Sequence, residues 1–262
     1  MIYVLADNII SPLGRTSEEN YHAVKAGNSA IRSYAPMTDG VPNGFMASLL
    51  SSDFEEIVFS SASKAISLSG IDVSDKRIIF ILSSTKGAIE NLGKTEDEKL
   101  YLGETAQRIA TRLGFRTRPI VVCNACISGS SALILASRLL QLGTYEHAVV
   151  CGADCPRQFI ISGFQSLNAM SFEACRPFDI ERQGLNLGEA AATVVLSSRL
   201  PAGEQATNKS DKRFWTIGHG HIKNDAFHIS APSKTAEGLL EALQQTMESV
   251  GKDDLAFINA HG

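Results

Sequence analysis

The feature that most constrains the fold of this chain is an alternation of short apolar runs with longer, helix-like segments. Residues 77–82 are almost entirely Ile, Phe and Leu, which is typical of a strand buried on both faces of a parallel sheet. A second apolar run over 119–123 leads into a helix over 127–142, and a third run follows at 148–151. Strand, helix and strand in this order predict a βαβ unit with a right-handed crossover. The pattern therefore predicts an α/β fold.

The remaining segments predict further elements of the same kind. In a capping box ahead of a first helix, the Thr16 hydroxyl accepts from the Glu19 amide and the Glu19 carboxylate accepts from the Thr16 amide. Asp53 with Glu56 repeats this arrangement before a helix that we expect to end near Gly70. The other expected segments are a helix over 105–113, a loop-rich stretch over 152–188, a strand over 190–196, a surface loop over 201–213, a strand over 214–218, a helix over 235–250 and a strand over 255–258.

Composition and charge narrow the class of protein. The 262 residues include 24 Lys and Arg against 28 Asp and Glu, which gives a formal net charge of −4. This slight acidity, without a cluster of basic residues, argues against a surface for nucleic acid or for an anionic membrane. No apolar run approaches the ~18 residues that a membrane span needs. Residues 1–6 lack the basic flank of a secretory signal, so we expect a first strand there and a cytoplasmic protein whose five cysteines are thiols.

The most informative stretch for function surrounds Cys126. This residue lies between a predicted strand and the helix over 127–142, which has Arg138 as its only charge and which we expect to be buried on every side. Unpaired amides and the positive end of the helix dipole would stabilise a thiolate at Cys126, which is the nucleophilic form of cysteine. The same amides can hold the oxyanion that develops when a thioester is attacked. Cys126 is therefore the candidate nucleophile.

Three other interpretations of the cysteines remain open. A free cysteine is most often a buried structural residue. Cys123, Cys126, Cys151 and Cys155 superficially match the spacing of a four-thiolate zinc site, but apolar strands rather than polar turns carry Cys123 and Cys151, so we expect no metal. A thioredoxin-like dithiol at Cys123 and Cys126 fits poorly, because the two residues between them lead into the predicted buried helix.

Further motifs stand in a definite order along the chain. Besides the Cys126 segment they are Pro12-Leu13-Gly14, Gly143, Val149-Val150-Cys151-Gly152-Ala153, Ser162-Gly163-Phe164, Ala169-Met170-Ser171, Cys175-Arg176-Pro177-Phe178-Asp179, Arg182, Gly184, Gly188-Glu189, Asp225-Ala226-Phe227-His228, Glu237-Gly238 and Ile258-Asn259-Ala260-His261-Gly262. This succession resembles the elongating β-ketoacyl-acyl-carrier-protein synthases of the thiolase-like superfamily. The order of the motifs makes the resemblance more specific than any one motif does.

The resemblance implies a thiolase-like fold, in which two similar halves pack as a layered α/β/α/β/α sandwich. Residues 1–200 would form the complete first half with the nucleophilic cysteine, and residues 214–262 would form the opening portion of the second half. A homodimer in which one strand of each first half pairs across the two-fold axis is also implied. The family carries a Lys, a second catalytic His and a Gly-rich loop beyond the His-Gly motif, so we expect a truncated chain with little or no full activity.

The reaction that the resemblance implies is a decarboxylating Claisen condensation. Cys126 would take an acyl chain from the phosphopantetheine thioester of an acyl carrier protein, and the carbanion from malonyl-carrier protein would attack the acyl-cysteine to give a 3-oxoacyl thioester. His261 matches the first of the family's two catalytic histidines and would stabilise the enolate. Phe164 matches a residue that lines the acyl pocket. The reaction needs no metal or redox cofactor, and it serves fatty-acid and polyketide synthesis alike.

Two functions of other classes remain open at this point. One is a non-catalytic, dimerising partner subunit of a synthase, although such partners resemble synthases without the active cysteine. The other is a degradative thiolase, which also uses a nucleophilic cysteine but acts with free coenzyme A. Comparing carrier-protein thioesters with coenzyme A thioesters as acyl donors separates a synthase from a thiolase.

Two further groups of polar residues are interpreted as structural. We expect Glu189, Asp179 and Arg182 to form a buried network without a catalytic role. His219 and His221 have the spacing of one face of a strand and lack a third ligand, so we expect a surface strand rather than a metal site.

Overall fold

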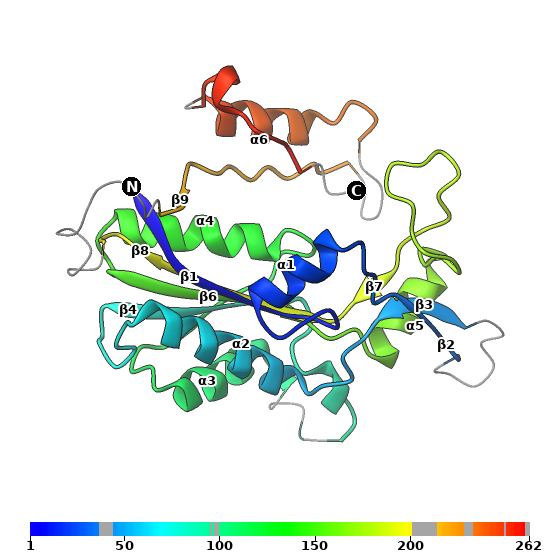
Figure 1. Ribbon diagram of the computed structural model, residues 1–262, viewed down its shortest axis with the longest axis horizontal. Coiled ribbons are helices and arrows are strands. Elements are labelled where there is room, and N and C mark those ends of the chain that lie inside the picture. Colours follow the sequence, from blue (N-terminus) through cyan, green and yellow to red (C-terminus); the bar gives the residue numbers. More distant parts are fainter. Residues whose placement is uncertain are drawn as a thin grey trace.

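The protein is built on a six-stranded sheet with helices on both faces (Figure 1). The computed structural model describes residues 1–36, 44–94, 96, 100–200, 214–227, 233–248 and 250–259. In spatial order the strands of this sheet are β5 (Ile120–Val122), β4 (Ile78–Ser83), β6 (His147–Asp154), β8 (Ala190–Ser197), β1 (Ile2–Ile10) and β9 (Thr216–Ile217). β4 runs parallel to both β5 and β6, whereas β8 is antiparallel to β6 and β1. The predicted strands at 77–82, 119–123 and 148–151 are therefore confirmed as neighbours in one sheet.

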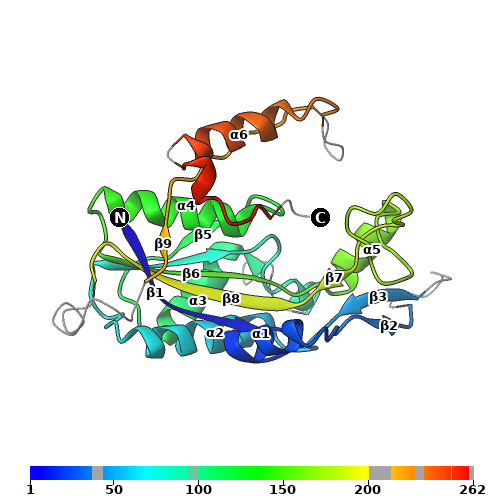
Figure 2. The same cartoon turned by 45° about the horizontal axis from the view of Figure 1, so that its top comes forward.

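Three helices cover this sheet. α2 (Phe54–Ser69) and α3 (Leu102–Leu113) lie on one face, and α4 (Ser128–Gln141) lies on the other (Figures 1 and 2). A second sheet, in the order β2 (Arg32–Tyr34), β3 (Phe45–Ser48) and β7 (Leu187–Gly188), lies beside the first. The remaining elements are α1 (Ser17–Lys25), α5 (Gln158–Ser166), α6 (Glu237–Met247) and the short 3-10 helices η1 (Ile89–Asn91) and η3 (Lys252–Asp254). Among the described residues, no helix is both long and apolar enough to cross a membrane.

The strand β4 shows why the central sheet requires an unbroken apolar sequence. Side chains of a strand alternate between the two faces. Ile78, Phe80 and Leu82 pack with α2 and α3 in one core, while Ile79 and Ile81 pack with α4 in another. Every residue of β4 is buried as a result, so the run of large apolar residues reports a strand with a hydrophobic core on each side.

The helix ends largely follow the local signals. Thr16 Oγ1 accepts from the Glu19 amide at 3.1 Å, as the capping box predicts, but the Glu19 carboxylate accepts from the Arg15 amide at 2.6 Å rather than from Thr16. α2 ends at Gly70, whose φ of 70° is the left-handed conformation that favours glycine. The start of α1 and the end of α2 were thus predictable from residues close to them.

Two predicted segments differ in the structure. The stretch over 152–188 is not only loop, because it contains α5, a helix of nine residues. Residues 255–258 were expected to be a strand, but they form no regular strand, and Leu255, Phe257 and Ile258 are exposed. An apolar sequence suits a strand only where a neighbouring strand supplies hydrogen bonds, and this segment pairs with none of the described strands. The expected loop over 201–213 lies outside the described residues.

The prediction that α4 is buried on every side is wrong for its outer face. Ala132, Ala136 and Leu140 face the sheet and are buried, whereas Ile134 is only partly covered. The cover comes from the segment after β9, where the Cα of Gly220 approaches Ile134 so closely that an added Cβ would lie 2.7 Å from its side chain. α6 lies beyond that segment (Figures 1 and 2).

Two polar contacts join the helix α6 to the segment after β9. Lys223 pairs with Glu241 at 2.7 Å, and Thr246 Oγ1 accepts from the His221 amide at 3.2 Å. Leu239 and Leu240 are 72% and 52% exposed. The sequence periodicity therefore predicted this helix correctly but not which of its faces turns inward. His219 and His221 are not on a strand, because β9 ends at Ile217.

Candidate functional site

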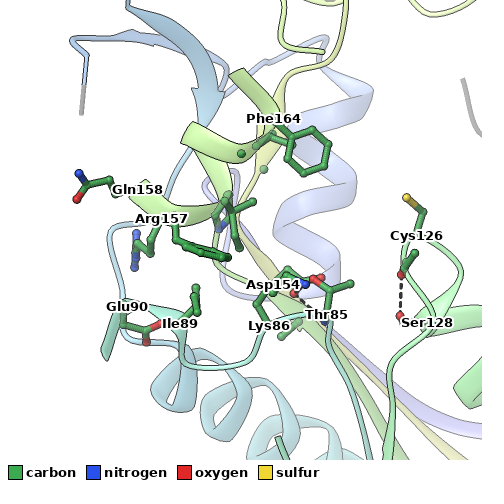
Figure 3. Close-up of a pocket in the computed structure, with 18 of the residues that line it drawn as sticks. Thr85, Lys86, Ile89, Glu90, Cys126, Ser128, Asp154, Arg157, Gln158 and Phe164 are labelled. Carbon is green, nitrogen blue, oxygen red and sulfur yellow. Dashed lines mark hydrogen bonds between the residues drawn. The ribbon is translucent and has the colours of Figure 1, made fainter. Parts of the chain in front are cut away.

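An open cavity of about 1710 Å³ lies at the carboxyl ends of β4 and β6 (Figure 3). The carboxyl ends of parallel strands are the place where open α/β sheets bind ligands. Five segments form its walls: the end of β4 with the following residues to Lys94, the turn before α4, the end of β6, α5, and β7 with the start of β8. They contribute, among others, Ser83, Thr85, Lys86, Ile89, Glu90, Ala125, Cys126, Ser128, Asp154, Arg157, Phe159, Ile160 and Phe164. A lining of this kind suits an apolar ligand with a polar reacting end.

Cys126 lies on the wall of this cavity, in the turn between β5 and α4. Its side chain is exposed, and it comes two residues before Ser128, the first residue of α4. The residue before it, Ala125, has a φ of 46°, in the left-handed region that non-glycine residues seldom occupy. The structure thus brings a free thiol, the leading end of a helix and an accessible cavity together, which is the placement that the sequence predicted.

Phe164 lies on a different wall of the same cavity. It belongs to α5 and packs against a small core that includes Phe45, Ile161 and Met170. Figure 3 shows its ring and the Cys126 side chain on separate segments that border the cavity. The helix that carries Phe164 was not predicted, but the residue is in the cavity that contains Cys126.

A carboxylate that sequence reasoning missed anchors the floor of the cavity. Asp154 ends β6, and its Oδ1 accepts from the Thr85 amide at 3.1 Å, from Thr85 Oγ1 at 3.0 Å and from Ser84 Oγ at 3.0 Å. These bonds join the end of β6 to the residues after β4 (Figure 3). An acidic residue at the end of an apolar strand is a signal that could have identified it.

An ion pair and a further carboxylate lie at the wall of the cavity that contains Arg157 and Glu90. Arg157 contacts Glu189 Oε1 at 2.7 Å, and Glu189 Oε2 accepts from the amides of Leu50 at 2.5 Å and Ser51 at 2.9 Å. Glu90 caps the start of α2, since its Oε1 accepts from the Phe54 amide at 2.9 Å, and burial raises the pKa of this carboxyl.

The expected buried network of Glu189, Asp179 and Arg182 is wrong. Only Glu189 is buried, and its partner is Arg157, whereas Asp179 is partly buried and Arg182 is exposed. The Arg182 side chain donates to the backbone carbonyl of Asp179 at 2.8 Å, a local bond within their own loop.

Four of the five cysteines fall into two environments, and these four do not form the four-thiolate site that their spacing superficially suggests. Cys151 and Cys155 are buried, while Cys123 and Cys126 are exposed. The Cys123 thiol donates to the Thr85 carbonyl oxygen at 3.7 Å. Within the described part of the chain, no group of three or more His, Cys, Asp or Glu side chains is arranged to hold a metal ion.

We expect iodoacetamide to distinguish these two environments in the native protein. Burial raises the pKa of the Cys151 thiol to about 12, and burial together with the charge of Glu189 also raises the pKa of the Cys155 thiol. Because the thiolate is the attacking form, only a very small fraction of Cys151 would be reactive near pH 8. Peptide mass spectrometry should find Cys123 and Cys126 alkylated well before Cys151 and Cys155. In urea all four should react alike; equal rates in the native protein would contradict the assignment.

His261, the other expected catalytic residue, lies outside the described residues. No geometry therefore relates it to Cys126, and its role stays a proposal.

Comparison with known proteins finds similarity in the part of the chain that contains this site. Residues 103–202, which include Cys126 and Phe164, match the model of "Beta-ketoacyl synthase, N-terminal domain". Over 152 residues the chain is 36% identical to 3-oxoacyl-[acyl-carrier-protein] synthase 2 of Rhizobium meliloti, an alignment that covers 54% of this chain and 35% of that protein. The Staphylococcus aureus protein of the same name is 29% identical over 163 residues, covering 59% of this chain and 40% of that protein. The chain thus spans less than half the length of these relatives.

Solved structures show the same fold. The ishigamide ketosynthase/chain length factor matches with a TM-score of 0.78 at 20% identity, covering 94% of this chain and 68% of that chain. A β-ketoacyl synthase from Burkholderia phymatum matches with a TM-score of 0.75 at 22% identity, covering 94% of this chain and 69% of that chain. The ketosynthase ApeO in complex with its chain length factor ApeC, from Xenorhabdus doucetiae, gives a TM-score of 0.76 at 20% identity, covering 94% and 67%. These matches confirm the predicted thiolase-like fold.

Proposed function

We propose that this chain contains the N-terminal domain of a β-ketoacyl synthase, the family whose model matches residues 103–202, and that Cys126 is the acyl-accepting nucleophile of a 3-oxoacyl-acyl-carrier-protein synthase. The observation that carries this proposal is the position of Cys126, an exposed thiol between β5 and α4 on the wall of a cavity of about 1710 Å³. A buried structural cysteine would have neither the exposure nor the adjacent cavity.

The proposed reaction has two stages. In the first, the Cys126 thiolate attacks the carbonyl carbon of an acyl thioester, and the carrier's phosphopantetheine thiolate leaves and takes up a proton. In the second, malonyl-carrier protein loses CO₂, and the resulting carbanion attacks the acyl-cysteine. The Cys126 thiolate then leaves, and the product is a 3-oxoacyl thioester. We propose that His261 donates to the malonyl thioester oxygen while the enolate forms.

The cavity supports an acyl chain as the group that Cys126 receives. Phe164 and the neighbouring apolar residues Phe159 and Ile160 belong to one wall, formed by α5. We propose that these side chains contact the acyl chain, because the free energy of a hydrocarbon falls when it moves from water to an apolar surface.

The partners and the division of the chain are proposals as well. We propose an acyl carrier protein as donor, in keeping with a structural relative described as a polyketide acyl-carrier protein in complex with its ketosynthase, which matches at a TM-score of 0.75. We also propose a homodimer, for which β5 supplies an edge strand of the described sheet. Residues 1–200 would be the first thiolase-like half, and residues 214–262 the opening portion of the second.

The test is a measurement of covalent acyl transfer to this chain. Incubation with an octanoyl-carrier-protein thioester should increase the intact mass by one octanoyl group, and peptide mass spectrometry should place that group on Cys126. Cys126→Ser should abolish the increment, because a serine hydroxyl is a far weaker nucleophile than a cysteine thiolate.

Cys123→Ser is the matched control, since Cys123 is also exposed and lies three residues away. It should retain the increment. Equal labelling of wild type and Cys126→Ser would refute the assignment. No labelling by any donor is the result expected of a non-catalytic partner subunit, and labelling by octanoyl-coenzyme A alone is the result expected of a degradative thiolase.

A further inference from the structure

One hydroxyl group closes the turn that carries Cys126. Ser128 Oγ accepts a hydrogen bond from the Asn124 amide at 2.8 Å and donates one to the Ala125 carbonyl oxygen at 2.6 Å. The two bonded groups lie on either side of Ala125, immediately before the nucleophile. Figure 3 shows Ser128 and Cys126 on the same segment at the cavity wall. The Ser128 side chain therefore links the backbone at the start of the turn to the backbone that leads directly into Cys126.

This link holds a backbone conformation that is unfavourable on its own. With its φ of 46°, Ala125 brings its Cβ close to the following carbonyl group, so only glycine adopts this region without cost. Such conformations persist where the surrounding contacts over-determine them. The backbone bonds of the turn, Ile127 amide to Asn124 oxygen and Ser128 amide to Ala125 oxygen, are both 3.2 Å long. The two bonds of the Ser128 hydroxyl are shorter than these.

The surroundings of Ser128 favour a fixed rather than a mobile hydroxyl. The residue is 5% exposed and is the first residue of α4, one helical turn before Ala132, which packs on the sheet. A second hydrogen bond joins α4 to this turn, because the Asn124 side-chain amide donates to Ser131 Oγ at 3.3 Å. A hydroxyl with one donated and one accepted bond is well satisfied, and without it the Asn124 amide would lose this acceptor.

We propose that Ser128 is a positioning residue for acyl transfer, which orients Cys126 by bonding the backbone on both sides of Ala125. Its hydroxyl acts through the main chain and takes no proton from the thiol. This inference rests on the proposed function of Cys126. Displacement of a reacting atom by about 1 Å costs on the order of a hundredfold in rate, so a loosened turn is expected to slow a directed attack much more than an undirected one.

The test compares two reactions of the same thiol in the full 262-residue chain. Acylation by octanoyl-carrier protein requires attack along one direction from a bound complex, whereas iodoacetamide reaches an exposed thiol from many directions. We expect Ser128→Ala to lower the maximal acylation rate roughly 10–100-fold. The donor concentration at half-maximal rate and the pH profile of iodoacetamide alkylation should stay near those of wild type. Ser128→Thr, which keeps the hydroxyl, should restore most of the acylation rate, and Ser128→Val, which has the shape of Thr without the hydroxyl, should not.

Ser137→Ala is the matched control, because Ser137 is in the same helix, is also 5% exposed and accepts only from Gln141 among the bonds described. It should acylate as wild type does, and thermal unfolding should show that every variant is folded. Normal acylation of Ser128→Ala, or an equal loss in Ser128→Thr, overturns the proposal while the function of Cys126 stands. A parallel fall in alkylation and acylation also overturns it. If wild type is not acylated at all, the proposed function fails first and this inference fails with it.

Discussion

Replacing Glu189 by alanine is expected to lower the free energy of unfolding by about 3–5 kcal/mol, the range for removing one partner of a buried ion pair. The Glu189 side chain is fully buried, and Arg157 opposite it is only 22% exposed. The variant would leave the Arg157 guanidinium partly buried without its carboxylate. It would also remove the acceptor of the Leu50 and Ser51 amides, which Glu189 holds at 2.5 and 2.9 Å. Unpaired buried polar groups account for the size of the effect.

Urea unfolding followed by circular dichroism measures this loss. The matched control is Glu181→Ala, since Glu181 also pairs with an arginine, Arg176 at 3.7 Å, but its side chain is 78% exposed. Exposed pairs contribute only about 0–1 kcal/mol, so the control should unfold almost as wild type does. A loss below about 1 kcal/mol in Glu189→Ala would show that the pair is dispensable. In that case this wall of the cavity is stabilised mainly by apolar packing.

Replacing Phe80 by alanine is expected to cost about 3–5 kcal/mol of stability, because it opens a cavity in the larger hydrophobic core. Phe80 is fully buried in β4, between the layers formed by α2 and α3 and by the sheet. Its ring lies 5.5 Å from that of Phe115, centroid to centroid. The centre of a close-packed sheet cannot collapse into the space, so both the transfer free energy and the dispersion contacts are lost.

Phe80→Leu keeps most of the volume and should cost much less, in the range of roughly 1.5 kcal/mol or below. Phe257→Ala is the control at the surface, because this side chain is 82% exposed, and it should change stability by about 0.5 kcal/mol or less. Differential scanning calorimetry and urea unfolding both report these values. Similar losses in Phe80→Ala and Phe257→Ala would mean that the core assigned to β4 is not the main source of stability.

Sequence reasoning succeeded where the signal is local. The unbroken apolar run of β4 identified a doubly covered strand, and Gly70 with its left-handed backbone identified the end of α2. Cys126 could be located because a strand, a turn of small residues and an apolar helix follow one another without interruption. Each of these features depends on residues that are close together in the sequence.

The site itself contains contacts that no local pattern reports. Asp154 bonds to Thr85, which is 69 residues away, and Glu189 bonds to Ser51 across 138 residues. Helix α5, which carries Phe164, lies in a stretch that was expected to be mainly loop. For α6 the sequence predicted a helix, but the leucines face solvent and Glu241 faces Lys223.

The amino-acid sequence by itself determined the α/β class, the buried strands, the helix between β5 and β6 and the thiol at its leading end. These follow from side-chain periodicity, capping and the conformational limits of single residues, all of which act over a few positions. Only the tertiary structure decided which side chains surround that thiol and which carboxylates are buried. Hydrogen bonds and packing between segments more than fifty residues apart depend on how the sheet brings strand ends together, and no short stretch of sequence contains that information.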